Sequence, residues 1–71
     1  ILVTMNRIKE VLKEKGIKQI WLAEKLGKSY NMVNGYVQNR QQPRLEVLNK
    51  IATILEMDVR ELIVSNKEDN K

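Results

Sequence analysis

The chain contains no cysteine and no histidine among its 71 residues. Without cysteine it can form neither a disulfide framework nor a thiolate metal site. Without histidine it lacks the commonest metal ligand and the commonest general base. An enzyme would have to rely on carboxylates, lysines or tyrosines, and the sequence does not cluster these, while so short a chain has little room for a deep pocket. We therefore expect neither catalysis nor a metal or cofactor site.

Long apolar runs are missing as well. No run approaches the roughly 18 residues that a membrane-spanning helix needs, and the opening ILVT is too short for a signal peptide. We therefore expect a cytoplasmic protein without a membrane association, in which Met5 is the natural initiator and residues 1–4 are an expression remnant. The length allows one domain, placed here at residues 5–64, and a flexible polar tail at residues 65–71.

Proline occurs once and glycine three times, and the apolar residues follow helical spacing nearly everywhere, so the sequence predicts an all-α fold. Five short helices are expected, with boundaries marked by capping residues, glycines and the proline. The first follows an Asn6 cap and ends at Gly16, the second covers residues 18–26 before Gly27, the third covers 30–38 after a Ser29 cap, the fourth covers 45–55 after Pro43, and the fifth opens at the capping box of Asp58 and Glu61. A single residue separates Gly27 from the Ser29 cap, so the second and third helices must turn sharply against each other.

Positive charge is concentrated in the middle of the chain. The net charge is +4, and residues 18–44 hold five basic residues against one acidic residue, whereas residues 45–71 hold four basic and six acidic residues. Residues 25–44 contain no acidic residue. This distribution predicts a surface that binds a polyanion, with an ordinary solvated surface as the alternative.

A helix-turn-helix is indicated by the run QIWLAEKLGKS at residues 19–29, followed by Val33 and Tyr36. This pattern resembles the motif of the Cro/lambda-repressor-like (Xre) family of DNA-binding domains. The later run PRLEVLNKIATILEMDVREL is similar to the fourth and fifth helices of that family, so the resemblance covers about residues 5–63. Lys18 and Lys28 replace a capping and an aliphatic residue that are usual in the family, and both add positive charge to the motif.

The resemblance implies a compact five-helix lambda-repressor-like domain whose third helix enters the major groove of double-stranded DNA. Base contacts are then expected from Tyr30, Asn31 and Asn34, because a carboxamide such as that of Asn31 can pair bidentately with adenine. Phosphate contacts are expected from the residues around that helix: Lys18, Gln19, Lys28, Asn39, Arg40 and Arg44. Gly35, which weakens the helix, is interpreted as clearance for close approach to DNA or to another helix.

Apolar residues beyond the motif suggest a partner. A homodimer is expected through Met57, Leu62, Ile63 and Val64, with completion of the monomer core as the alternative for these residues. Trp21 lies off the apolar stripe of its helix and is expected to be partly buried, or to contact the DNA backbone or another protein.

The expected function is sequence-specific DNA binding by a small transcriptional repressor. A phage repressor, a restriction-system controller and the antitoxin of a toxin–antitoxin pair, with a toxin protein as second partner, would share these features. A protein-interaction module using the same fold without DNA is the other alternative. That module would not need the acid-free residues 25–44, which therefore favour DNA.

Overall fold

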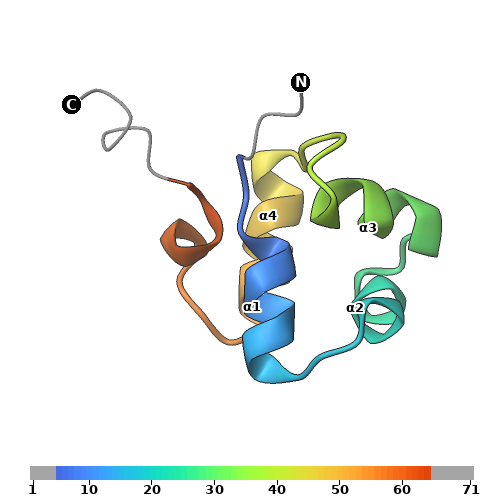
Figure 1. The fold of residues 1–71 in the computed structure, drawn as a ribbon, viewed down its shortest axis with the longest axis horizontal. Helices are drawn as coiled ribbons and strands as arrows, with labels where there is room; N and C mark the ends of the chain where they lie inside the picture. Colours follow the sequence, from blue (N-terminus) through green and yellow to red (C-terminus); the bar gives the residue numbers. More distant parts are fainter. Residues whose placement is uncertain (1–4, 65–71) are drawn as a thin grey trace.

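The computed structural model describes residues 5–64, which form four α-helices and one turn of 3-10 helix (Figure 1). The elements in chain order are α1 (Ile8–Lys15), α2 (Gln19–Leu26), α3 (Tyr30–Val37), α4 (Leu45–Ile54) and the 3-10 helix η1 (Val59–Leu62). The all-α prediction is confirmed. No helix in the described part is long and apolar enough to cross a membrane. The expected remnant and tail, residues 1–4 and 65–71, lie outside the described residues.

The prediction of a fifth α-helix is wrong, because the chain makes only the four-residue turn η1 at that place. Asp58 does cap this turn, and its carboxylate accepts a hydrogen bond from the Arg60 amide at 2.8 Å. The helix stops because Ile63 takes an extended conformation (φ −110°, ψ 136°) and pairs with Asn6 in an antiparallel bridge. A contact between the two ends of the domain therefore overrides the local capping signal.

Two glycines end α1 and α2 in the way their positions predict. Gly16 (φ 68°) and Gly27 (φ 71°) both take the left-handed conformation that residues with a side chain rarely adopt. Each is followed by a residue whose amide returns to the helix: Ile17 donates to the Leu12 carbonyl, and Lys28 donates to the Ala23 carbonyl. Both helices thus end in Schellman motifs, which turn the chain sharply within two residues.

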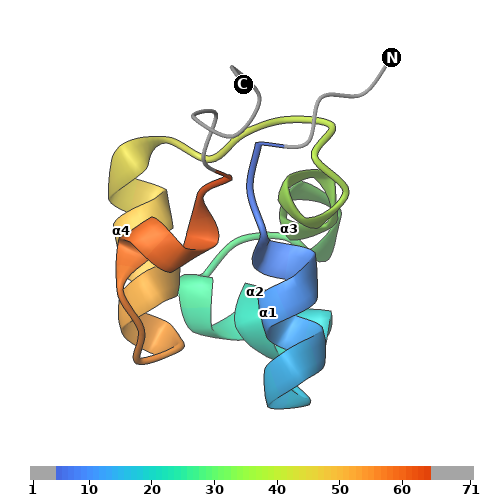
Figure 2. The same cartoon turned by 60° about the vertical axis from the view of Figure 1, so that its left-hand side comes forward.

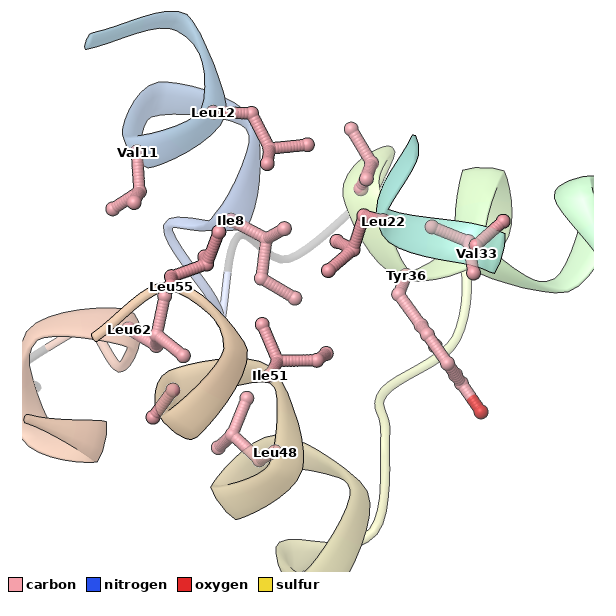
Figure 3. Close-up of a cluster of buried hydrophobic side chains, with 13 residues drawn as sticks. Ile8, Val11, Leu12, Leu22, Val33, Tyr36, Leu48, Ile51, Leu55 and Leu62 are labelled. Carbon is pink, nitrogen blue, oxygen red and sulfur yellow. The ribbon is translucent and has the colours of Figure 1, made fainter. Parts of the chain in front are cut away.

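The core lies among α1, α2, α3 and α4 and is closed by η1 (Figure 3). Five side chains are fully buried, and they come from every helical element: Ile8, Leu22, Val33, Ile51 and Leu62. The hydroxyl end of Tyr36 points away from the other labelled side chains (Figure 3). Helix propensity in α3 is poor, so its stability depends on burying Val33, Tyr36 and Val37 in this core.

The N-terminal segment before α1 is held on both sides. Two backbone hydrogen bonds tie it to the end of the domain, from Arg7 N to the Leu62 carbonyl (2.8 Å) and from Val64 N to the Met5 carbonyl (3.1 Å). In Figure 2 the end of η1 runs beside this segment. On the other side, the Asn39 carboxamide accepts from the Asn6 N–H (2.9 Å) and donates to the Asn6 carbonyl (3.2 Å). The Asn39 side chain therefore occupies the place that a neighbouring β-strand would take.

Asn6 itself is a buried polar residue rather than the N-cap of α1. The cap position belongs to Arg7, but the Asn6 side chain still accepts a hydrogen bond from the Ile8 amide at 3.1 Å. Its Nδ2 donates to the Tyr36 carbonyl (3.0 Å) and to Oε1 of Gln42 (2.8 Å). One amide thus joins the start of α1, the end of α3 and the loop that leads to α4.

Candidate nucleic-acid interface

The helix-turn-helix is formed by α2, the turn at Gly27 and α3, which pack against each other (Figure 1). The Ser29 hydroxyl caps α3 by accepting a hydrogen bond from the Met32 amide at 3.1 Å. Leu22 and Ala23 of α2 are buried against the same core as Val33 of α3. The small side chain of Ala23 permits close helix crossing, so the two helices form one rigid unit that presents the outer face of α3.

The outer face of α3 is polar but uncharged. Tyr30 is 50 % exposed, Asn31 is exposed, and Asn34 is half-buried beside them. Met32 is also exposed, at 40 %. The three expected base-contacting residues thus lie together on the first two turns of α3, next to one apolar side chain that helical spacing did not single out.

Gln19 and Asn34 are joined by a hydrogen bond. The Gln19 Nε2 donates to the Asn34 Oδ1 at 3.0 Å, and both side chains are partly buried. The sequence assigned Gln19 to a phosphate and Asn34 to a base, whereas the structure brings the two amides into contact. This bond fixes the orientation of Asn34 from the N-terminus of α2 and leaves fewer free groups on either residue for DNA.

Gly35 lies against the loop after α3, a contact that the sequence did not suggest. It is buried, and a Cβ built on it would lie 3.2 to 3.4 Å from the side chain of Gln41. The clearance therefore accommodates the loop after α3 rather than another helix, and the clearance for DNA stays a prediction. Gln41 was not singled out from the sequence, and the unexplained mid-helix glycine was the only signal that pointed toward it.

The loop after α3 begins with Asn39 in the left-handed conformation (φ 60°). Its side-chain oxygen accepts hydrogen bonds from the amides of Met5 and Asn6, both at 2.9 Å, and from Nε2 of Gln42 at 3.2 Å. The predicted phosphate contact of Asn39 stays a prediction, but its side chain already holds the N-terminal segment in place.

Four cationic residues expected at phosphates lie before and after α3 in the sequence. Lys18 is the residue before α2, Lys28 lies in the turn, and Arg40 and Arg44 lie in the loop between α3 and α4. Lys28 is half-buried and the other three are exposed. Within residues 5–64 the only ion pair joins Arg60 to Asp58, so no carboxylate neutralises these four cations there.

That ion pair lies at the start of η1, where the guanidinium of Arg60 hydrogen-bonds the Asp58 carboxylate at 2.9 Å. The hydrogen bond lowers the pKa of the Asp58 carboxyl from its usual range and raises the pKa of Arg60. Residues 5–64 hold no group of three His, Cys, Asp or Glu side chains that could bind a metal ion.

Trp21 is 39 % exposed and lies on α2 beside the exposed Ile20. The Nζ of Lys25 lies 5.4 Å from the centre of the Trp21 ring, within the range of a cation–π contact. Trp21 and Ile20 line a shallow pocket with Gly16 and Ile17 at the α1–α2 corner. Trp21 is therefore only partly covered, by its own helix and this corner.

The residues expected at a dimer interface do not share one environment. Leu62 is fully buried among the core residues, so it has no surface to offer a partner, and its assignment to the interface is wrong. Met57 packs against the core and is half-buried, as is Val64. Ile63 is 44 % exposed and is the one residue of the set with a large free apolar surface.

Comparisons with known proteins agree with this geometry. Residues 7–68 match the family model of the Cro/C1-type HTH DNA-binding domain. A search of curated proteins finds no significant match. Among solved structures, one from Bacteroides fragilis, described as a candidate DNA-binding protein, is 47 % identical, with 86 % of this chain and 100 % of that chain covered and a TM-score of 0.82.

Two further structures carry the same fold at lower identity. The N-terminal DNA-binding domain of SinR from Bacillus subtilis is 34 % identical over 76 % of this chain and 80 % of that one, with a TM-score of 0.65. A transcriptional regulator from Listeria innocua is 25 % identical over 94 % of this chain and 71 % of that one, with a TM-score of 0.68. With a helix-turn-helix built from α2 and α3 and a family match over most of its length, the chain belongs to the Cro/C1-type helix-turn-helix DNA-binding domains.

Proposed function

We propose that the protein binds double-stranded DNA sequence-specifically as a small transcriptional regulator, with repression as its mode of action. The observation that carries the proposal is the outer face of α3, where uncharged hydrogen-bonding side chains lie on a rigid helix. Cationic residues that pair with no carboxylate within residues 5–64 flank this helix in the chain. Such a surface is suited to reading base edges with the helix and gripping phosphates around it. Nothing in this division of roles calls for catalysis.

In this proposal α3 lies in the major groove with its first turn nearest the bases. Asn31 is exposed and is the second residue of α3, so its carboxamide is free to pair with N6 and N7 of adenine. Tyr30 offers a hydroxyl donor and a ring that can contact a thymine methyl group. Lys18, Lys28, Arg40 and Arg44 supply the phosphate contacts, and Gln19 acts through Asn34 as well as at the backbone.

We further propose that the regulator acts as a homodimer, as a repressor that reads two half-sites about one helical turn apart. Ile63, together with Met57 and Val64, is the apolar surface that supports this proposal. The area around one exposed isoleucine is small, so the association is expected to depend on protein concentration and on DNA that aligns two copies.

A second candidate is an antitoxin that binds the same DNA and also a toxin protein. One observation favours it: the exposed pair of Ile20 and Trp21, which DNA binding through α3 does not use. If Trp21→Ala leaves DNA affinity unchanged and no protein co-purifies with the parent protein in a Trp21-dependent way, this candidate is excluded.

The decisive experiment is selection of bound fragments from random DNA with the purified protein. We expect a defined and palindromic site. On that site, Asn31→Ala should weaken specific binding by roughly 1–3 kcal/mol and leave non-specific binding nearly unchanged. Asn49→Ala, which removes an exposed amide from α4, is the matched control and should change neither. Equal losses on specific and random DNA would show that Asn31 does not read a base.

A further inference from the structure

The feature from which the inference starts is the missing side chain at Gly35. Gly35 follows Asn31 by four residues, which places both positions on the same face of α3. An ideal Cβ on Gly35 would lie 3.2 Å from Cγ, 3.4 Å from Cδ and 3.3 Å from Nε2 of Gln41. The Gln41 side chain therefore lies along α3 at the place that a residue-35 side chain would fill.

The backbone of the loop holds Gln41 there. The Gly35 carbonyl accepts hydrogen bonds from the amides of Arg40 (2.9 Å) and Gln41 (3.3 Å), after Asn39 has turned the chain back with its positive φ. Two side-chain amides of the same loop are fixed as well. Asn39 accepts a hydrogen bond from the backbone N–H of Asn6, and the Oε1 of Gln42 accepts one from the Asn6 Nδ2 at 2.8 Å. Gln41 is thus an exposed side chain on an anchored loop.

We propose that Gln41 is a base-reading residue, which supplies from the loop the carboxamide that α3 lacks at Gly35. The inference rests on the proposed DNA binding through α3 and extends it to a second reading group. No Asn or Gln on the helix itself could take this place, because the loop lies against the helix there. Asn31 and Gln41 then form one row of two carboxamides along the groove-facing side.

The two carboxamides of this row indicate which base they would recognise. Gln, like Asn, can pair bidentately with N6 and N7 of adenine, whereas the commonest readers of guanine are Arg and Lys, and α3 contains neither. The four-residue step from Asn31 to Gly35 advances about 6 Å along the helix, close to two base-pair steps of about 3.4 Å. Each half-site should therefore contain two adenines read by this row, about one to two base pairs apart.

The test uses the selected site with 7-deazaadenine placed at one adenine at a time, which removes the N7 acceptor. Gln41→Ala is expected to weaken specific binding roughly 5- to 150-fold, the equivalent of one bidentate pair, and to leave random-DNA binding unchanged. One adenine should be sensitive to the N7 deletion in the parent protein and insensitive in Gln41→Ala. A second adenine should behave in the same way toward Asn31→Ala, and Asn49→Ala should leave both sensitivities intact.

Gly35→Ala separates reading from folding. The atoms nearest to the added methyl group all belong to the exposed, flexible side chain of Gln41, and alanine favours a helix over glycine, so the thermal midpoint should stay constant or rise. Because the Gln41 side chain must shift by a few tenths of an ångström to make room for the methyl group, specific affinity should nevertheless fall, by less than in Gln41→Ala. The double variant should lose no more than Gln41→Ala alone.

Other outcomes overturn the inference in distinguishable ways. If Gln41→Ala weakens binding to specific and random DNA equally, Gln41 contacts a phosphate rather than a base. Unchanged specific affinity would remove it from the reading surface, and guanine at the position that Gln41→Ala relaxes would overturn its assignment to adenine. If the parent protein selects no preferred sequence at all, the proposed function itself fails, and the role of Gln41 fails with it.

Discussion

Removal of the Asn6 side chain should destabilise the whole domain, although the residue lies in an irregular segment before the first helix. Asn6 is only 3 % exposed, and its amide makes three hydrogen bonds, with the Ile8 amide, the Tyr36 carbonyl and the Gln42 side chain. Asn6→Ala removes all three at once. The Ile8 amide, in the first turn of α1, is the group most affected, because helix geometry gives it no backbone acceptor within the helix.

The magnitude follows from these contacts. A net hydrogen bond contributes about 1 kcal/mol, and leaving a buried donor unpaired costs about 1–3 kcal/mol, so we expect a loss of about 3 kcal/mol. A domain of this size has a free energy of unfolding of roughly 3–9 kcal/mol. The loss is therefore a third or more of the total and should lower the thermal midpoint by about 12–24 °C.

The assay is urea denaturation followed by far-UV circular dichroism, with Gln42→Ala and Asn49→Ala as graded comparisons. Gln42→Ala removes one hydrogen bond to the Asn6 amide and another to Asn39, and should cost about 1 kcal/mol. Asn49→Ala acts on an exposed position of α4 and should stay within about 0.5 kcal/mol of the parent. A loss below about 1 kcal/mol for Asn6→Ala would refute the reasoning, because water would then replace these bonds at no cost.

Three further predictions concern binding, association and pH. Arg40→Ala should weaken binding to all DNA sequences and reduce the slope of log affinity against log salt by about one unit, and an unchanged slope would remove Arg40 from the phosphate contacts. Ile63→Glu should sediment as a monomer at concentrations where the parent protein dimerises, and identical sedimentation of both would reject the proposed interface. Because Arg60 lowers the pKa of Asp58 in the folded state, the ion pair stabilises the fold above the ordinary carboxyl pKa, and this contribution is lost as the pH falls through the folded-state value. Asp58→Asn should therefore show a lower urea midpoint near neutral pH and a shallower decline below about pH 4, and parallel pH profiles would contradict the coupling.

The four α-helices and the helix-turn-helix were predictable because their signals are local. Gly16, Gly27 and the Ser29 cap each act within a few residues of their own position, and the structure places the helix boundaries within one or two residues of those expected. The fifth helix was mispredicted because pairing between Ile63 and Asn6 is a contact across nearly the whole domain. No local pattern encodes such a contact.

The sequence predicted which residues lie at the candidate site, but not which of them contact each other. The outward positions of Tyr30 and Asn31 follow from helical periodicity after the Ser29 cap. The hydrogen bond between Gln19 and Asn34 does not, because each residue was assigned alone and only the packing of α2 on α3 brings the amides together. The contact of Gln41 with Gly35 likewise depends on how the loop turns at Asn39, where the left-handed conformation is stabilised by bonds to a segment more than 30 residues away.

The bridge between the N-terminal segment and the end of η1 affects the order in which parts of the domain fold and open. Two backbone hydrogen bonds, at Arg7 and Val64, close almost the full length of the described chain, while the helices are held by buried side chains. We expect this closure to form late in folding and to open first, because it costs the closure entropy of the longest loop and is stabilised by few contacts. Its amides should exchange with solvent by local opening, well before those around Ile51. The hydrogen bonds from Met5 and Asn6 to Asn39 lie on the other side of the N-terminal segment, so they would hold this segment against the loop that carries Gln41 while the bridge to η1 is open.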